Sequence, residues 1–241
     1  MISERGSQRT FFAVSGLLFA ASAALTIAWS VSMSAMGGMW MPMPGQTWAG
    51  AAASFLGMWV VMMVAMMLPS LVPMLRRYRQ AVERTGDARL GRLTALAGLG
   101  YFFVWTVFGL AAFPLGVALA SAGPLAAGVV VLIAGAFQFS AWKARYLAHC
   151  REAPGPGRTL PADAGTAWRH GVHLGLHCSR SSAGLMAVLL AIGVMDLRAM
   201  AAVAAAITVE RLAPAGTRFA RGIGALVVVV GLFLITRTVA L

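Results

Sequence analysis

Apolar runs long enough to cross a lipid bilayer recur along the whole chain of 241 residues. Sixty per cent of the residues are hydrophobic and only 11% are charged, which is outside the range of soluble proteins. A run of about twenty apolar residues suffices for a transmembrane helix. We therefore expect an all-α, polytopic transmembrane helical bundle that forms a single integral membrane domain over residues 1–241.

The apolar runs predict about seven helices, with six as the alternative. The two interpretations differ at residues 185–209, which form either one long tilted helix or a tight hairpin in which Asp196 caps the next helix. Farther upstream, Pro124 is expected to begin a helix after a turn at residues 121–123. The predicted helices cover residues 11–33, 52–75, 95–121, 125–142, 179–195, 197–213 and 221–239.

The net charge of +12 comes from basic residues that lie between the apolar runs. This placement is typical of membrane orientation signals and argues against nucleic acid as a partner. With the hairpin, all but Arg198 and Arg237 of the 19 lysine and arginine residues fall on one side. We therefore predict a cytoplasmic N-terminus, an outer C-terminus and a location in the bacterial inner membrane.

Methionines concentrate in the segment 34–50 and in the helix that follows it. Within this helix Met58, Met62 and Met66 share one face. Thioethers are soft ligands that suit Cu(I), but methionine also fills irregular gaps between helices, and both interpretations stay open. The candidate ligands of this group are Met39, Met41, Met43, Met62, Met66 and Met67.

All four histidines and both cysteines lie within the predicted inner loop 143–180. His170, His173 and His177 are spaced so that a helix would show all three on one side, with Cys178 adjoining. Histidine and cysteine together suit copper or zinc, although a solvated helix at the membrane surface explains the same pattern. The cysteines are expected as free thiols, and the candidate metal ligands are His149, Cys150, His173, His177 and Cys178.

The sequence predicts no enzymatic activity. It contains no GxSxG, P-loop, Rossmann or HExxH pattern, and no pair of carboxylates within an apolar run. Glu210 lies beside Arg211 near a predicted helix end, where we expect the two to pair at the membrane interface.

An ordered series of motifs resembles DUF2182, a bacterial family of integral membrane proteins predicted to bind metal. The resemblance covers most of the chain and implies a metal site at its last long block, residues 175–186. This chain departs from the family there, with Ser181, Ser182 and Ala183 where two cysteines and a tryptophan are usual, and it also lacks a cysteine near Tyr146. The matching blocks are Ala65-Met66-Met67-x-Pro69-Ser70, Gly100-Tyr101-x-x-Val104-Trp105, Lys143–Arg151, Gly175–Met186, Gly193–Leu197 and Glu210-Arg211.

These features predict an integral membrane protein that binds or handles a soft metal. Copper as Cu(I) is favoured over zinc, because the methionines remain while family cysteines are missing. The expected partners are the lipid bilayer and another membrane or periplasmic protein. The alternative is a non-catalytic accessory or structural subunit in which the methionines only pack against helices or against a partner chain.

Overall fold

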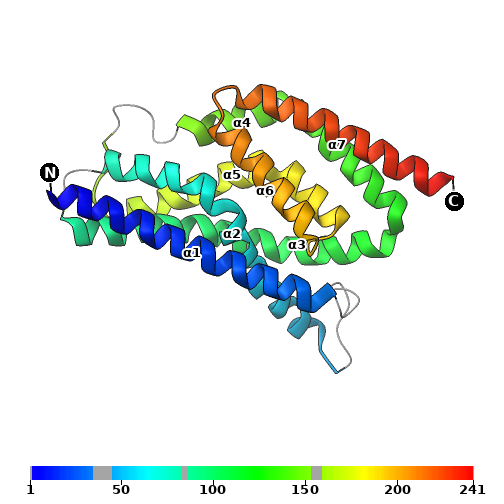
Figure 1. The fold of residues 1–241 in the computed structure, drawn as a ribbon, viewed down its shortest axis with the longest axis horizontal. Helices are drawn as coiled ribbons and strands as arrows, with labels where there is room; N and C mark the ends of the chain where they lie inside the picture. The colour runs from blue at the N-terminus through cyan, green and yellow to red at the C-terminus, as the bar shows by residue number, and fades with distance from the viewer. Residues whose placement is uncertain (1, 35–44, 83–85, 153–158, 241) are drawn as a thin grey trace.

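The computed structural model describes residues 2–34, 45–82, 86–152 and 159–240. These ranges form an all-helical bundle without strands (Figure 1). Five of the helices are long and apolar enough to cross a membrane, namely α1, α2, α3, α5 and α7. The helices are α1 (Ile2–Ser34), α2 (Trp48–Ala81), α3 (Asp87–Phe137), α4 (Ala141–Glu152), α5 (Ala164–Ile192), α6 (Leu197–Leu212) and α7 (Gly216–Val239).

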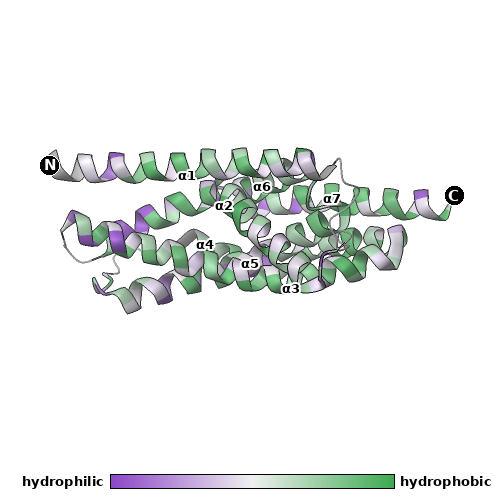
Figure 2. Ribbon diagram, turned by 90° about the horizontal axis from the view of Figure 1, so that it is seen from below, coloured by the Kyte–Doolittle hydropathy of each residue, from purple (hydrophilic) through white to green (hydrophobic). Residues whose placement is uncertain are grey.

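The long helices run roughly along the long axis of the molecule, with the N-terminus at one end and the C-terminus at the other (Figure 1). The end of α2 and the starts of α3 and α5 lie toward the N-terminal end, and the α5–α6 turn lies toward the opposite end. Hydrophilic residues gather mainly at the N-terminal end (Figure 2). This asymmetry agrees with the predicted grouping of the basic residues on one side.

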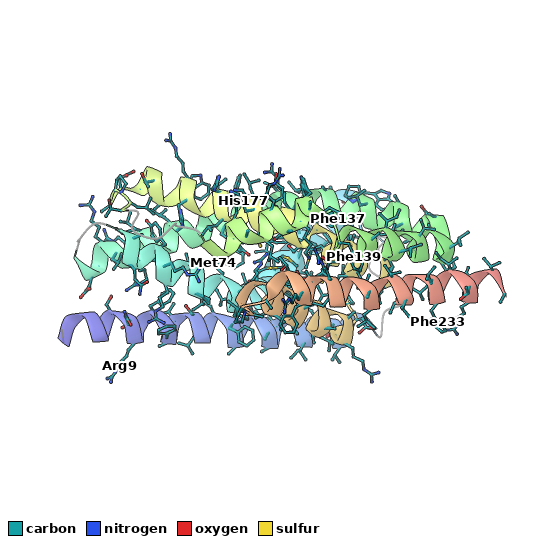
Figure 3. All side chains as sticks on the ribbon, turned by 90° about the horizontal axis from the view of Figure 1, so that it is seen from above. Arg9, Met74, Phe137, Phe139, His177 and Phe233 are labelled. Carbon is teal, nitrogen blue, oxygen red and sulfur yellow. The ribbon has the colours of Figure 1, made fainter. Side chains whose placement is uncertain are left out.

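Helices α2 and α5 form the centre of the bundle. In their most apolar windows 56% of the residues are buried, compared with 11–17% in α1, α3 and α7. The outer helices expose large apolar side chains such as Leu17, Leu110 and Phe233, and Figure 3 shows Phe233 pointing away from the bundle. An apolar exterior of this extent is expected of helices that face lipid.

Helix α3 consists of two helices separated by a kink. At Gly123 the backbone has φ 83° and ψ 178°. This conformation is not helical, and glycine adopts it readily because it has no Cβ atom. Pro124 follows and begins the second half, so the predicted turn at residues 121–123 is confirmed. The predicted helix 125–142 is wrong at its end, because α3 stops at Phe137 and Ala141–Glu152 form a separate helix.

The α5–α6 hairpin is confirmed. Helix α5 ends at Ile192, and Gly193 follows with φ 133°. The Asp196 carboxylate accepts hydrogen bonds from the backbone N–H groups of Arg198 (2.8 Å) and Ala199 (3.0 Å). It therefore caps α6 as predicted, and the single long helix of the six-helix alternative is excluded.

The remaining boundaries differ because polar residues extend the helices beyond the apolar runs. Helix α5 begins at Ala164 rather than at residue 179, with the carboxylate of Asp163 accepting from the Thr166 N–H at 2.8 Å. The stretch 143–180, predicted as a loop, is thus mostly helical in its described part. Helices α1, α2 and α3 likewise start or end several residues outside the predicted ranges 11–33, 52–75 and 95–121.

Glycines bring α3 and α5 into close contact. A Cβ atom added at Gly171 would lie 2.0 Å from the backbone oxygen of Ala97. One added at Gly175 would lie 2.9 Å from the backbone oxygen of Tyr101. Such small residues four apart allow two helix backbones to approach closely in membrane proteins. This contact fixes Tyr101 next to the middle of α5.

Candidate metal centre

The methionines of α2 lie inside the bundle. Their side chains are at most 4% exposed, and Met186 of α5 and Met200 of α6 belong to the same core. Packing is therefore one role that these residues have. The predicted ligands Met39, Met41 and Met43 lie outside the described residues. The buried α2 methionines are Met58, Met62, Met63, Met66, Met67 and Met74.

A buried arginine meets a cysteine in the centre of the structure. Arg211, near the end of α6, is 4% exposed, and its guanidinium lies 2.7 Å from the Sγ atom of Cys178 on α5. Arginine has donors but no acceptor, so the sulfur is the acceptor. The same guanidinium donates to the Ser70 hydroxyl of α2 at 3.0 Å and to the Cys178 carbonyl oxygen at 3.3 Å.

Two further helices complete the cluster around Cys178. The Tyr101 hydroxyl of α3 lies 2.6 Å from the Cys178 sulfur. Cys150 of α4 is fully buried, and its sulfur lies 3.9 Å from the hydroxyl of Ser181, which also receives a bond from Arg211 at 3.5 Å. Helices α2 to α6 thus each contribute a side chain. We call Ser70, Tyr101, Cys150, Cys178, Ser181 and Arg211 the sulfur–arginine cluster.

Both cysteines are free thiols, as predicted. Burial raises the pKa of the Cys150 thiol to about 11, and Arg211 opposes this shift. Without a metal this thiol therefore keeps its proton at neutral pH, and a metal that binds there displaces the proton.

A buried ion pair between Lys143 and Glu210 lies beside the cluster. The Lys143 ammonium of α4 lies 2.7 Å from a carboxylate oxygen of Glu210, and the Gln138 amide donates to the other oxygen at 3.2 Å. The predicted interfacial pair of Glu210 with Arg211 is therefore wrong. Consecutive helical residues point in different directions, so Glu210 faces α4 while Arg211 faces α5 and α2.

The surroundings of the Arg211 charge are unusual for a buried guanidinium. Among the residues that the structure describes, no aspartate or glutamate lies within ion-pair distance of its guanidinium. A buried charge is costly unless it is paired. The thiol sulfur of Cys178 is a group beside this guanidinium that can carry negative charge, so the cluster is suited to a negatively charged sulfur ligand or complex.

The histidines lie apart from the cysteines. His149 and His173 are exposed on α4 and α5 and contact the half-buried His177, whereas His170 stacks on Tyr78 at 5.0 Å between ring centroids. All three of His170, His173 and His177 are on one side of α5, as predicted, but the ring of His170 stacks on Tyr78 rather than on another histidine. Among the described residues, no three His, Cys, Asp or Glu side chains are positioned together to hold a metal.

The departure from the resembled family falls inside the cluster. The Ser181 hydroxyl donates to the Cys178 carbonyl oxygen at 2.9 Å and lies 3.9 Å from the Cys150 sulfur, so a cysteine at this position would lie next to Cys150. The Ser182 hydroxyl donates to the same carbonyl oxygen at 2.7 Å. Tyr146, the other position at which a cysteine is usual, contacts His177 with ring centroids 5.4 Å apart.

Residues 56–234 match the PpoB2 family, which is described as a copper chaperone. The chain belongs to this family. The PpoB2 match includes every helix of the cluster, from α2 to α6. It agrees with the expected association with copper, while the name DUF2182 rests on the sequence motifs alone. No curated protein and no solved structure matches the chain.

Sequence reasoning missed Ser70, Tyr101, Lys143 and Arg211 as functional candidates. Each of them nevertheless lies in one of the motif blocks quoted above. These blocks are far apart in the chain and meet at the cluster in the fold. Reading the polar residues of the blocks as one site would have found the cluster.

Proposed function

We propose that this chain is a multi-pass protein of the bacterial inner membrane that binds Cu(I) and passes it to another protein without catalysing a reaction. The observation that carries the proposal is the buried guanidinium of Arg211 at 2.7 Å from the Cys178 sulfur. The description of the PpoB2 family as a copper chaperone supports copper as the cargo. The apolar exteriors of α1, α3 and α7 support the membrane location.

In the proposed complex Cu(I) lies between Cys178 and Cys150. Cysteine sulfur is a soft ligand that selects Cu(I). A cuprous ion bound by two thiolates carries one net negative charge, which the guanidinium of Arg211 balances in the interior. This balance of charges accounts for a buried arginine beside the sulfur of Cys178.

The methionines of α2 supply further soft ligands next to this centre. The Ser70 hydroxyl that receives the Arg211 bond donates to the backbone oxygen of Met67 at 3.0 Å, so the cluster adjoins the end of the methionine stripe. We propose that Met62, Met66 and Met67 form a thioether path toward Met39, Met41 and Met43. A periplasmic or membrane protein would then receive the ion at the outer side.

A second candidate function is an accessory or structural membrane subunit. The burial of all six α2 methionines in the core favours this function, because buried thioethers adapt well to irregular packing. Replacing Met62 and Met66 with leucine separates the two. If the methionines only pack, copper retention should not change, and each replacement should lower the free energy of unfolding by less than about 1.5 kcal/mol. If they form a thioether path, the folded variant should release copper more slowly.

The proposal is tested by the copper content of purified protein, loaded with Cu(I) under reducing conditions and challenged with a Cu(I) chelator. We expect one ion per chain to be held by the cysteines against the chelator in the wild type, and at least a tenfold lower affinity of this buried site in Cys178→Ser and Cys150→Ser. Serine keeps the size and hydrogen bonding of the thiol but is a much poorer soft-metal ligand. Each variant's thermal midpoint without metal shows whether it is folded.

Met186→Leu serves as the matched control, since it removes a buried sulfur from the same helix as Cys178. Full copper retention in folded Cys178→Ser would overturn the site. Folded wild-type protein that retains no Cu(I) at all would overturn the function.

A further inference from the structure

Three imidazole rings meet on the surface formed by α4 and α5. The Nε2 atoms of His173 and His177, one turn apart on α5, lie 3.2 Å from each other. The ring of His149 on α4 stacks on that of His177, with centroids 5.1 Å apart and planes within 7°. Figure 3 shows His177 on the side of the bundle and Met74 among the helices.

The separation of the two nitrogens matches a shared metal ion. Two imidazole nitrogens that bind one tetrahedral ion at the usual distance lie about 3.3 Å apart. The two Nε2 atoms already lie at this spacing. Imidazole nitrogen suits copper and zinc, so the pair is a preformed half of such a site.

His149 can supply a third ligand once its ring turns out of the stack with His177. Its Nδ1 atom lies 3.0 Å from the backbone oxygen of Arg145. A carbonyl oxygen can only accept, so Nδ1 carries the proton and Nε2 keeps a free lone pair. Metal-binding histidines commonly show this pattern, in which the second nitrogen donates to a backbone carbonyl. The ring has to leave its stacked position to reach an ion at the other two.

Charge favours a singly charged ion at this surface. The Arg180 guanidinium lies 5.4 Å from the ring centroid of Tyr146, which itself contacts His177. A nearby positive charge repels a divalent ion about twice as strongly as a monovalent one. Cu(I) is therefore the better fit than Zn(II).

We propose that His173 and His177, with His149, form a surface site for Cu(I), distinct from the sulfur–arginine cluster. Cys178 follows His177 directly and faces the interior, where it is fully buried. The surface site thus adjoins the buried one, because His177 and Cys178 are consecutive residues of α5. Its role as the point where copper enters the sulfur–arginine cluster rests on the proposed function, whereas metal binding itself does not.

The test uses full-length protein in which Cys150→Ser and Cys178→Ser remove the buried thiols. We expect this double variant to bind one Cu(I), and His173→Gln with His177→Gln to lower the affinity at least tenfold. His170→Gln is the matched control, because it removes an imidazole of the same helix that stacks on Tyr78. No Cu(I) in the folded double variant, or tighter binding of Zn(II) than of Cu(I), overturns the proposal.

The entry role has a separate readout. With both cysteines present, His173→Gln with His177→Gln should slow copper loading at least fivefold without changing the final copper content of the buried site. An unchanged loading rate overturns the entry role. Protein whose cysteines retain no copper, but whose histidines still bind it, shows that the proposed function fails while the surface site stands.

Discussion

Arg211 places a permanent positive charge inside the bundle, and its neighbours show how the site is balanced. Its guanidinium reaches sulfur, two hydroxyl groups and a carbonyl oxygen. None of these groups is a carboxylate, so the charge is matched when a sulfur ligand carries negative charge. Ser181 lies at the edge of this arrangement, between Arg211 and Cys150.

Ser181→Cys should increase the affinity for Cu(I) at least tenfold. The added thiol would face Cys150, whose sulfur lies 3.9 Å from the serine hydroxyl, and a third thiolate strengthens a soft-metal site. Competition with a Cu(I) chelator measures the change. Ser179→Cys is the control, because it adds a buried thiol to the same helix two residues away, where the side chain points to a different side of α5. An equal gain in both variants would mean that any added thiol suffices.

At the level of single residues, the sequence identified residue types that can bind metal but not how they group in space. Cys150, Cys178, His173 and His177 were identified because metals bind cysteine and histidine. Helical spacing shows which residues share a face, but not which face is buried. The division into buried cysteines and exposed histidines depends on contacts between α3, α4 and α5, which a local pattern does not contain.

At the level of helices, strong local signals predicted the turns and weak ones missed the polar ends. Gly123 before Pro124, and Gly193 before Asp196, mark turns through backbone conformation and capping. The first half of α5 carries histidine and arginine and has low hydropathy, so a search for apolar runs does not detect it. Helix α4 was missed for the same reason.

The contact between α4 and α6 depends on the Lys143–Glu210 pair. Glu210→Leu should lower the free energy of unfolding by about 3–5 kcal/mol, because it leaves the buried ammonium of Lys143 without a counter-charge. Adding Lys143→Met should restore most of the loss, since two apolar side chains can replace a buried ion pair. Denaturation in detergent measures both variants.

Copper content provides the control for these variants. Arg211 bonds to Ser70, Cys178 and Ser181 rather than to Glu210, so the double variant should bind Cu(I) like the wild type. If the double variant were as unstable as Glu210→Leu, the instability of Glu210→Leu would not result from the unpaired ammonium of Lys143.

At the level of the whole molecule, hydrophilic residues gather mainly at the N-terminal end (Figure 2), and the C-terminus lies at the opposite end (Figure 1). The orientation predicted from the charges would place the N-terminal end on the cytoplasmic side. Helix α6 is the helix whose membrane crossing is most open to question. With 16 residues, α6 is about 24 Å long, which is shorter than the hydrocarbon core of a bilayer of about 30 Å. Its inner end therefore stays within the protein, where Glu210 and Arg211 are buried.

A reporter fused after Leu241 should be active if it functions in the periplasm and silent if it functions in the cytoplasm. With a cytoplasmic N-terminus, the hairpin at Gly193 would return the chain through α6, so that α7 would cross outward and the C-terminus would lie outside. A fusion after Gly86, in the α2–α3 connection, is the control and should give the reverse pattern. If the cytoplasmic reporter were active at both positions, α6 would not cross. Helix α6 would then begin and end on the same side of the membrane and would serve to position Arg211.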